Sequence, residues 1–252
     1  MNILFIHQNF PGQFKHLAPE LVKKGHDVFA LFPKRDVPSS WQGINLKLYN
    51  IDRGNSDDIH PLLLDLESKV IRAEACFKAA IELSKEGYKP DVIIAHPGWG
   101  ESLFLKQVWP SAKLGIYCEF YYHTKGVDVG FDKEFGKDNL SDLARVQLKN
   151  ANILLHAQQA ESAITPTHWQ ASTFPQHIQG KITVVHDGID TKIVAPNPKV
   201  AIVLPNGKRI KKSDKVITFV SRSLEPYRGF HIFMRAVGEI LEAQPDVEIL
   251  II

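Results

Sequence analysis

Short apolar runs alternate with segments of helical periodicity from the start of the chain. Residues 2–7 (NILFIH) form one run, apolar side chains then recur at helical spacing over 14–22, and a second run follows at 27–32 (DVFALF). Runs this short, apolar on both faces and separated by helices, are typical of parallel strands that helices cover on both sides. The sequence therefore predicts an α/β fold built on a parallel sheet.

The alternation continues along the chain and indicates two domains. Further strands are predicted at 44–51, 92–95, 113–122, 162–165 and 182–185, and helices at 58–86, 101–108 and 138–150. The run at 153–157 (ILLHA) fits either a strand or a continuation of the preceding helix. Two prolines in 195–199 (APNPK) mark a linker, and after it residues 201–220 read as a strand, an Asn-Gly turn and a strand, followed by a helix at 230–241. We predict an N-terminal domain at 1–195 and the beginning of a second, incomplete domain at 196–252.

Composition excludes several classes of protein. A formal net charge of +2 over 252 residues gives no reason to expect nucleic acid as a partner. Cys76 and Cys118 lack metal-ligand spacing, and we expect two buried thiols in a reducing compartment. The chain has neither a signal-peptide pattern nor an apolar run near the roughly 18 residues that span a bilayer, so a cytoplasmic location is expected.

The densest basic run, 208–212 (KRIKK), lies beside an Asn-Gly pair. It fits a solvated hairpin turn, and it also fits a patch for anionic lipid or substrate. The second reading permits peripheral contact with the inner face of a membrane.

Three candidate site residues follow predicted strands, where open parallel sheets bind ligands. Gly12 ends the first loop, where its lack of a side chain serves either a tight turn or the approach of a phosphate or sugar. His96 precedes a Gly-Trp-Gly segment and fits a donor to a substrate hydroxyl or a structural histidine. Glu119 is expected to be partly buried, which costs free energy unless it is paired. It is a candidate base, charge stabiliser or sugar ligand, or a structural hydrogen-bond partner.

Arg222 and Arg228 flank the loop between the strand predicted to end at residue 220 and the last helix. Arginine grips phosphate through two parallel charge-assisted hydrogen bonds, and Gly229 lets the backbone come close. The alternative is a pair of surface arginines bound to Glu225 or to solvent. No metal-ligand cluster is evident, so no metal is expected, and the absence of G-x-G-x-x-G counts against an NAD oxidoreductase.

Three stretches resemble the retaining glycosyltransferases of family 4 (group 1), which have the GT-B architecture of two Rossmann-like domains. They are 11–28 (PGQFKHLAPELVKKGHDV), 181–196 (KITVVHDGIDTKIVAP) and 219–237 (FVSRSLEPYRGFHIFMRAV). The resemblance implies that Arg222 and Arg228 hold the diphosphate of a nucleotide-sugar donor and that Gly12 lies near phosphate and acceptor. Glu119 stands where many members have a histidine.

The family's E-x7-E pair is found only at Glu74 and Glu82, on the long helix of the first domain, where both are predicted to face solvent. The chain therefore looks truncated in its second domain, and by itself it is expected to be inactive.

The resulting hypothesis is a retaining, hexosyltransferase-like enzyme with Glu119 and His96 at its catalytic centre. It would move a sugar from a nucleotide-diphosphate sugar, without a further cofactor, to a hydroxyl of a glycan, lipid or small molecule. Two alternatives stay open: a non-catalytic sugar or nucleotide binder of the same fold, and a GT-B type sugar epimerase.

Overall fold

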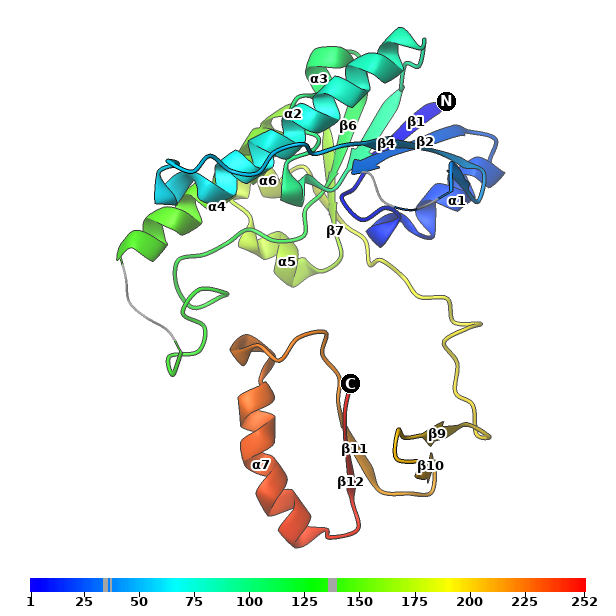
Figure 1. The fold of residues 1–252 in the computed structure, drawn as a ribbon, viewed down its shortest axis with the longest axis vertical. Helices are drawn as coiled ribbons and strands as arrows, with labels where there is room; N and C mark the ends of the chain where they lie inside the picture. Colours follow the sequence, from blue (N-terminus) through cyan, green and yellow to red (C-terminus); the bar gives the residue numbers. More distant parts are fainter. Residues whose placement is uncertain (34–35, 37, 136–139) are drawn as a thin grey trace. The chain divides into compact units, whose positions relative to one another are not determined.

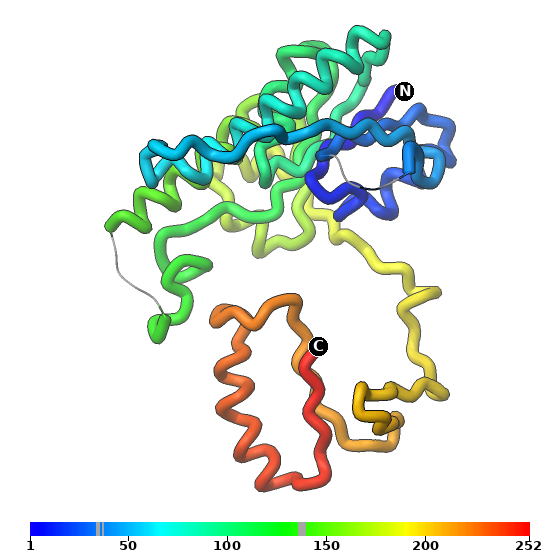
Figure 2. The backbone as a smooth tube through the Cα atoms, in the orientation of Figure 1, coloured from blue at the N-terminus to red at the C-terminus, as the bar shows by residue number. Residues whose placement is uncertain are grey.

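The computed structural model describes residues 1–33, 36, 38–135 and 140–252, and it divides into two compact units (Figures 1 and 2). Unit 1 comprises Met1–Thr124 and Asp138–Asp187, and unit 2 comprises Lys125–Lys137 and Gly188–Ile252. The long second part of unit 2 thus begins at Gly188. The assignment of domains to 1–195 and 196–252 stays a prediction.

Unit 1 is built on an eight-stranded sheet with the order β3-β4-β2-β1-β5-β6-β7-β8. The strands are β1 (Asn2–Ile6), β2 (Asp27–Pro33), β3 (Ser40–Trp41), β4 (Ile44–Tyr49), β5 (Val92–Ala95), β6 (Lys113–Tyr117), β7 (Ser162–Thr165) and β8 (Ile182–Val184). Neighbouring strands are parallel except for the pair β3–β4. The predicted α/β class with a parallel sheet is confirmed.

Helices cover both faces of this sheet (Figure 1). They are α1 (Leu17–Lys23), α2 (Leu64–Lys85), α3 (Leu105–Val108), α4 (Leu140–Gln159), α5 (His168–Thr173) and α6 (Gln176–Gln179), with the 3-10 turns η1 (Gly12–Phe14), η2 (Pro61–Leu63) and η3 (Pro97–Trp99). Side chains of β1 alternate between two apolar cores: Leu4 shares one with Cys76 of α2, and Phe5 shares the other with Ala18 of α1. Cys76 and Cys118 are free, buried thiols, as predicted.

Several helices and strands begin or end at other residues than predicted. The segment 153–157 continues α4, so its strand alternative is wrong, and the strand predicted over 113–122 ends at Tyr117. Beyond that point Cys118 donates its N–H to the Ile164 carbonyl, and the neighbouring strand β7 itself ends at Thr165. The long helix begins at Leu64, because His60 and Pro61 form the cap of η2 before it. The predicted helix start at 138–139 lies outside the described residues.

Unit 2 has two small sheets. β9 (Ala201–Val203) and β10 (Arg209–Lys211) form an antiparallel hairpin, and β11 (Val216–Phe219) pairs in parallel with β12 (Glu248–Ile251) through η4 (Pro226–Arg228) and α7 (Phe230–Ala243). The turn predicted at Asn206-Gly207 is confirmed, but the strand predicted after it is not continuous to residue 220: β10 ends at Lys211, and β11 belongs to the other sheet. Lys208 of the basic run forms an ion pair with Glu248, and contact of this run with a membrane stays a prediction.

Figure 2 shows an extended path, in yellow, where the chain leaves β8. Among the described residues, no helix is long and apolar enough to cross a bilayer.

Candidate functional site

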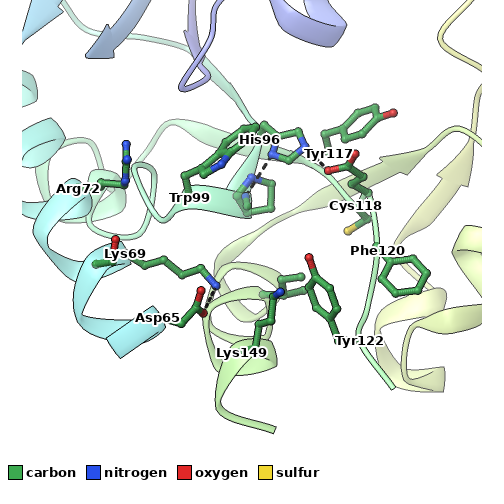
Figure 3. A pocket seen from close by; sticks show the side chains of 15 residues that line it. Asp65, Lys69, Arg72, His96, Trp99, Tyr117, Cys118, Phe120, Tyr122 and Lys149 are labelled. Carbon is green, nitrogen blue, oxygen red and sulfur yellow. Dashed lines mark hydrogen bonds and ion pairs between the residues drawn. The ribbon is translucent and has the colours of Figure 1, made fainter. Parts of the chain in front are cut away.

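A pocket of about 290 Å³ opens in unit 1 beside the carboxyl ends of β5 and β6 (Figure 3). Parallel sheets bind ligands at this edge, so the position agrees with the general rule. One wall consists of the residues that follow the two strands, and the other belongs to α2 and α4. The lining residues are Asp65, Ser68, Lys69, Arg72, His96, Pro97, Gly98, Trp99, Tyr117, Cys118, Glu119, Phe120, Tyr122, Lys149 and Ile153.

His96 and Glu119 meet in this pocket. The His96 side chain is buried and caps η3: its Nδ1 accepts the N–H of Gly98 at 3.2 Å. The proton of the neutral ring must then sit on Nε2, which lies 3.2 Å from Oε2 of Glu119. The two groups lie at ion-pair distance, and the Nε2 atom of His96 is buried without a hydrogen-bond partner among the described residues. The structure brings together the two residues that the sequence singled out after β5 and β6.

Aromatic rings hold His96 in place. Its ring lies 5.3 Å from that of Tyr117, with an interplanar angle of 24°, and 4.7 Å from that of Trp99. The Tyr117 hydroxyl donates to the carboxylate of Asp187 at 3.0 Å, and burial raises the pKa of Tyr117. His7, which follows β1, packs edge-on against His96 at 5.3 Å. The imidazole is thus confined by contacts on several sides.

The structure explains why position 12 is occupied by glycine. Its φ is +47°, and a Cβ added there would overlap the ring of His7. His7 is itself fixed, because its Nδ1 accepts the N–H of Asn9 and its Nε2 lies 2.7 Å from Oε1 of Gln13. Gly12 therefore lets η1 pack on a histidine that in turn touches His96. Its predicted proximity to phosphate and acceptor stays a prediction.

The buried carboxylate of this region is Glu101 and not Glu119. The Glu119 side chain is 56% exposed, because β6 ends at Tyr117 and leaves it outside the sheet; the expectation of partial burial is wrong. Glu101 has only 1% of its surface exposed, and burial raises the pKa of its carboxyl to about 7. Nη1 of Arg72 lies 3.6 Å from Oε1 of Glu101, an ion-pair distance too long for a hydrogen bond.

The opposite wall of the pocket is basic. Asp65, Lys69 and Arg72 lie at positions i, i+4 and i+7 of one face of α2, the spacing that places side chains in line along a helix. Lys69, with a side chain only 11% exposed, places its Nζ 2.6 Å from Oδ2 of Asp65. Lys149 of α4 holds its Nζ 3.9 Å from the centre of the Tyr122 ring. Figure 3 shows these side chains around the pocket.

The predicted phosphate-binding residues belong to unit 2. Arg222 is exposed in the loop after β11, and Arg228 lies in η4, with its Nε 3.7 Å from Oε2 of Glu225. The alternative partner of the sequence analysis, Glu225, is therefore in contact with one of the two arginines. Gly229 has a φ of +77° and forms the N-cap of α7, so the first amides of that helix lie beside the arginines in sequence. The diphosphate role of these residues stays a prediction.

One group of side chains in unit 2 has ligand atoms suited to a metal ion. Asp132, Glu134 and His231 have theirs within 4.8 Å of one another. Each already has a protein partner, since His231 Nε2 lies 2.9 Å from Oδ2 of Asp132 and Arg235 donates to Glu134 at 2.8 Å. The expectation that no metal is required stays a prediction.

Sequence reasoning missed the basic wall and the buried Glu101. The helical spacing of Asp65, Lys69 and Arg72 was visible, and it indicates a shared face. Nothing local shows that this face lines a pocket, since the loops after β5 and β6 form the other side. The solvent-facing positions predicted for Glu74 and Glu82 are confirmed, and the two pair with Lys78 and Lys85 respectively.

Comparisons with known proteins agree with this architecture. A family model described as the glycosyl transferase family 4 group matches residues 24–194. A D-inositol 3-phosphate glycosyltransferase from Segniliparus rotundus is 21% identical over 240 residues, which are 90% of this chain and 48% of the relative. The chain thus spans about half the length of that curated relative.

Two solved structures share the fold. The catalytic domain of starch synthase IV from Arabidopsis thaliana, bound to ADP and acarbose, matches 100% of this chain and 68% of its own with a TM-score of 0.61 and 13% identity. A candidate UDP-N-acetylglucosamine 2-epimerase from Listeria monocytogenes matches 99% of this chain and 62% of its own with a TM-score of 0.52 and 17% identity. The family match covers more than half of the chain, and together with the shared fold it leads to one conclusion: the chain belongs to the glycosyl transferase family 4 group and has the GT-B fold.

Proposed function

We propose that this chain serves a retaining transfer of a sugar from a nucleotide-diphosphate sugar to an acceptor hydroxyl. The acceptor binds in the pocket of unit 1, and the donor's diphosphate binds to Arg222, Arg228 and the backbone at Gly229. The observation that carries the proposal is the pair of His96 and Glu119, 3.2 Å apart, at the edge of a family 4 sheet where ligands bind. ADP bound to starch synthase IV and the sugar transfer named for the Segniliparus relative support the donor class.

The chemical step assigns a role to each residue. The bond between the sugar's anomeric carbon and the diphosphate breaks, and the diphosphate leaves with the electron pair. A bond forms from the acceptor oxygen to the same face of that carbon, and the acceptor proton passes to the carboxylate of Glu119. His96 lies beside this carboxylate, with its Nε2 3.2 Å from Oε2, and its positive charge when protonated would favour the ionised form of Glu119. The arginines stabilise the negative charge that develops on the leaving diphosphate.

The test is acceptor-dependent release of nucleoside diphosphate by the natural gene product that contains this chain. Donors with different bases and sugars are supplied with and without a pool of acceptors. Glu119→Gln and Arg222→Ala are each expected to lower the rate by about 100-fold or more, since removal of one group that stabilises a transition state commonly costs that much. Lys85→Gln, at the exposed end of α2, serves as the control. A rate within about threefold of the wild type in both site variants would sink the assigned roles.

Two other results would replace the proposal. The GT-B fold also occurs in the candidate epimerase from Listeria, so a modified sugar formed from donor alone would assign epimerase chemistry. Tight binding of a donor with no turnover under any acceptor would favour a sugar or nucleotide binder.

A further inference from the structure

Two buried asparagines of α4 reach the two loops that carry His96 and Glu119. Asn150 and Asn152 have 4% and 1% of their surface exposed. Asparagine is among the poorer residues for the interior of a helix, and burial of its amide costs free energy unless the polar atoms are hydrogen-bonded. The hydrogen bonds of these two side chains therefore indicate what they do.

Asn150 holds the backbone that follows β6. Its Oδ1 accepts the N–H of Tyr122 at 3.0 Å, and its Nδ2 donates to the carbonyl of the same residue at 2.8 Å. In an antiparallel sheet, a residue of the neighbouring strand exchanges the same two hydrogen bonds. The side-chain amide thus takes the place of a strand beyond the end of β6 at Tyr117.

Helix α5 fastens the same segment from another side. Gln170 donates from Nε2 to the carbonyl of Glu119 at 2.8 Å. Thr173 accepts the N–H of Tyr121 at its Oγ1, at 3.2 Å. The backbone that carries Glu119 is therefore fixed by side chains of both α4 and α5.

These hydrogen bonds also set the directions of the side chains along the segment. Phe120 and Tyr122 line the pocket together with Glu119, whereas Tyr121 packs against the core of unit 1. Such alternation is typical of an extended strand. A rotation of this backbone would exchange the two sets and would carry Glu119 away from His96.

Asn152 holds the loop that follows β5. Its Nδ2 donates to the carbonyl of Pro97 at 2.7 Å, and Pro97 comes directly after His96. On the other side of this loop, a Cβ on Gly100, whose φ is +96°, would overlap the carbonyl of Lys69 in α2. The loop is thus confined between α2 and α4.

We propose that Asn150 and Asn152 are positioning residues for the site. One helix, α4, fixes the loops after β5 and β6 relative to each other, and so holds Nε2 of His96 at 3.2 Å from Oε2 of Glu119. The inference rests on the proposed function for the reaction that this pair serves, but the placement of the two loops does not depend on turnover.

Hydrogen exchange of the 252-residue chain tests the placement without donor or acceptor. Asn150→Ala should lower the protection of the Tyr122 amide by about tenfold, because it removes the acceptor of that N–H. Asn152→Ala should lower the protection of the Gly100 amide, whose N–H donates to the carbonyl of Pro97 that Asn152 also binds. The amides of β6 should keep their wild-type protection in both variants.

Leu83→Ala is the control for a general loss of stability. Leu83 is buried in the apolar core of unit 1. Its truncation should lower the protection of the β6 amides and of the Tyr122 amide together, because both are exposed when the whole unit unfolds. A loss confined to Tyr122 in Asn150→Ala is therefore distinct from destabilisation.

Asn150→Asp separates hydrogen bonding from packing. An ionised carboxylate at this position accepts the N–H of Tyr122 but cannot donate to its carbonyl, whereas a protonated carboxyl does both. Protection of the Tyr122 amide, relative to the wild type, should therefore be higher at about pH 5 than at about pH 8. Asn150→Ala should show no such recovery.

The link to the reaction is measured on the natural gene product, by release of nucleoside diphosphate. Asn150→Ala and Asn152→Ala should each lower kcat by about tenfold or more and change KM by less than about threefold, since a misplacement of about 1 Å can cost about 100-fold in rate. Leu83→Ala should keep its kcat at a temperature where it is folded.

Three results decide the matter. Losses of protection at Tyr122 and Gly100 that are no larger than those in β6 would overturn the placement of the loops by α4. A kcat retained in both asparagine variants, despite loosened loops, would overturn their role in positioning the site. A wild type that releases no nucleoside diphosphate would count against the proposed function alone, because the exchange results are independent of it.

Discussion

Unit 1 and unit 2 are built from the same alternation of strands and helices, yet they bury very different amounts of apolar surface. In unit 1 two cores lie on opposite faces of an eight-stranded sheet, and the large side chains Phe5, Phe14 and Leu83 are fully buried. Among the described residues of unit 2 the buried apolar side chains are Ile210, Val247 and Leu250, and α7 has none. Ile232 of α7 is 57% exposed.

This difference bears on two sets of proposed binding residues, one in each unit. The pocket of unit 1 rests on a packed frame that can hold a buried lysine and a buried glutamate, groups that are costly to bury unless the surroundings fix them. The arginines of unit 2 lie in the segment between β11 and α7, and the framework around them is only two paired strands and one helix. Arg222 is exposed. We therefore expect the side chains of the pocket in unit 1 to keep fixed positions, and the arginines of unit 2 to adjust when phosphate binds.

Truncating one apolar side chain in each unit gives the strongest test of this difference in burial. Leu83→Ala is expected to lower the free energy of unfolding of unit 1 by about 2–5 kcal/mol, because it leaves a cavity under α2. Ile232→Ala is expected to change stability by less than about 0.5 kcal/mol. The four tryptophans, Trp41, Trp99, Trp109 and Trp169, all lie in unit 1. Their fluorescence during unfolding in urea therefore measures the stability of Leu83→Ala.

Hydrogen exchange of the α7 amides measures the effect of Ile232→Ala on the stability of unit 2. If Ile232→Ala lowers the protection of these amides as much as a core substitution would, then Ile232 is buried in solution. The contrast in burial between the two units would then be wrong.

The next effect concerns the buried carboxyl of unit 1. The pKa of Glu101 is raised from 4.5 to about 7 in the folded chain, so the folded state keeps a proton that the unfolded state loses. Stability should therefore fall as pH rises from 4.5 to about 7, by up to about 3 kcal/mol, and stay level above that. Glu101→Gln should remove this fall and be more stable than the wild type at about pH 8.

Urea midpoints at about pH 5 and about pH 8, read from tryptophan fluorescence, measure the effect of Glu101→Gln. Glu119→Gln, at an exposed carboxyl, is the control and should keep the wild-type profile. The same fall with pH in Glu101→Gln would show that another group causes it.

The smallest effect compares two glycines with left-handed backbones. Gly12 and Gly229 have φ values of +47° and +77°, and alanine at either costs about 1 kcal/mol in the backbone. A Cβ at Gly12 also meets the His7 ring, whereas the space beside Gly229 is open. Gly12→Ala should therefore be the more destabilising of the two by about 1–2 kcal/mol. Equal melting temperatures for the two variants would show that His7 moves aside at no cost.

Much of the fold was predictable from local patterns, and the site only in part. The strands at 92–95 and 162–165, and the turn at Asn206-Gly207, have the expected positions, because their apolar runs and turn residues act over a few positions. The end of β6 was not predictable, since it depends on where its neighbour β7 ends. His96 and Glu119 were identified from their places after strands. Their contact was not, because it joins residues of two different strands.

The sequence alone determined the α/β class, the resemblance to family 4, and the residue types available at the strand ends. These follow from periodicity and short motifs, which do not depend on distant contacts. Only the tertiary structure decided that Glu101 is the buried carboxyl and Glu119 the exposed one, and that Lys69, Arg72 and Lys149 face the same pocket as His96. Burial and charge compensation are set by residues far apart in the chain, so they appear only once α2 and α4 pack beside the loops after β5 and β6.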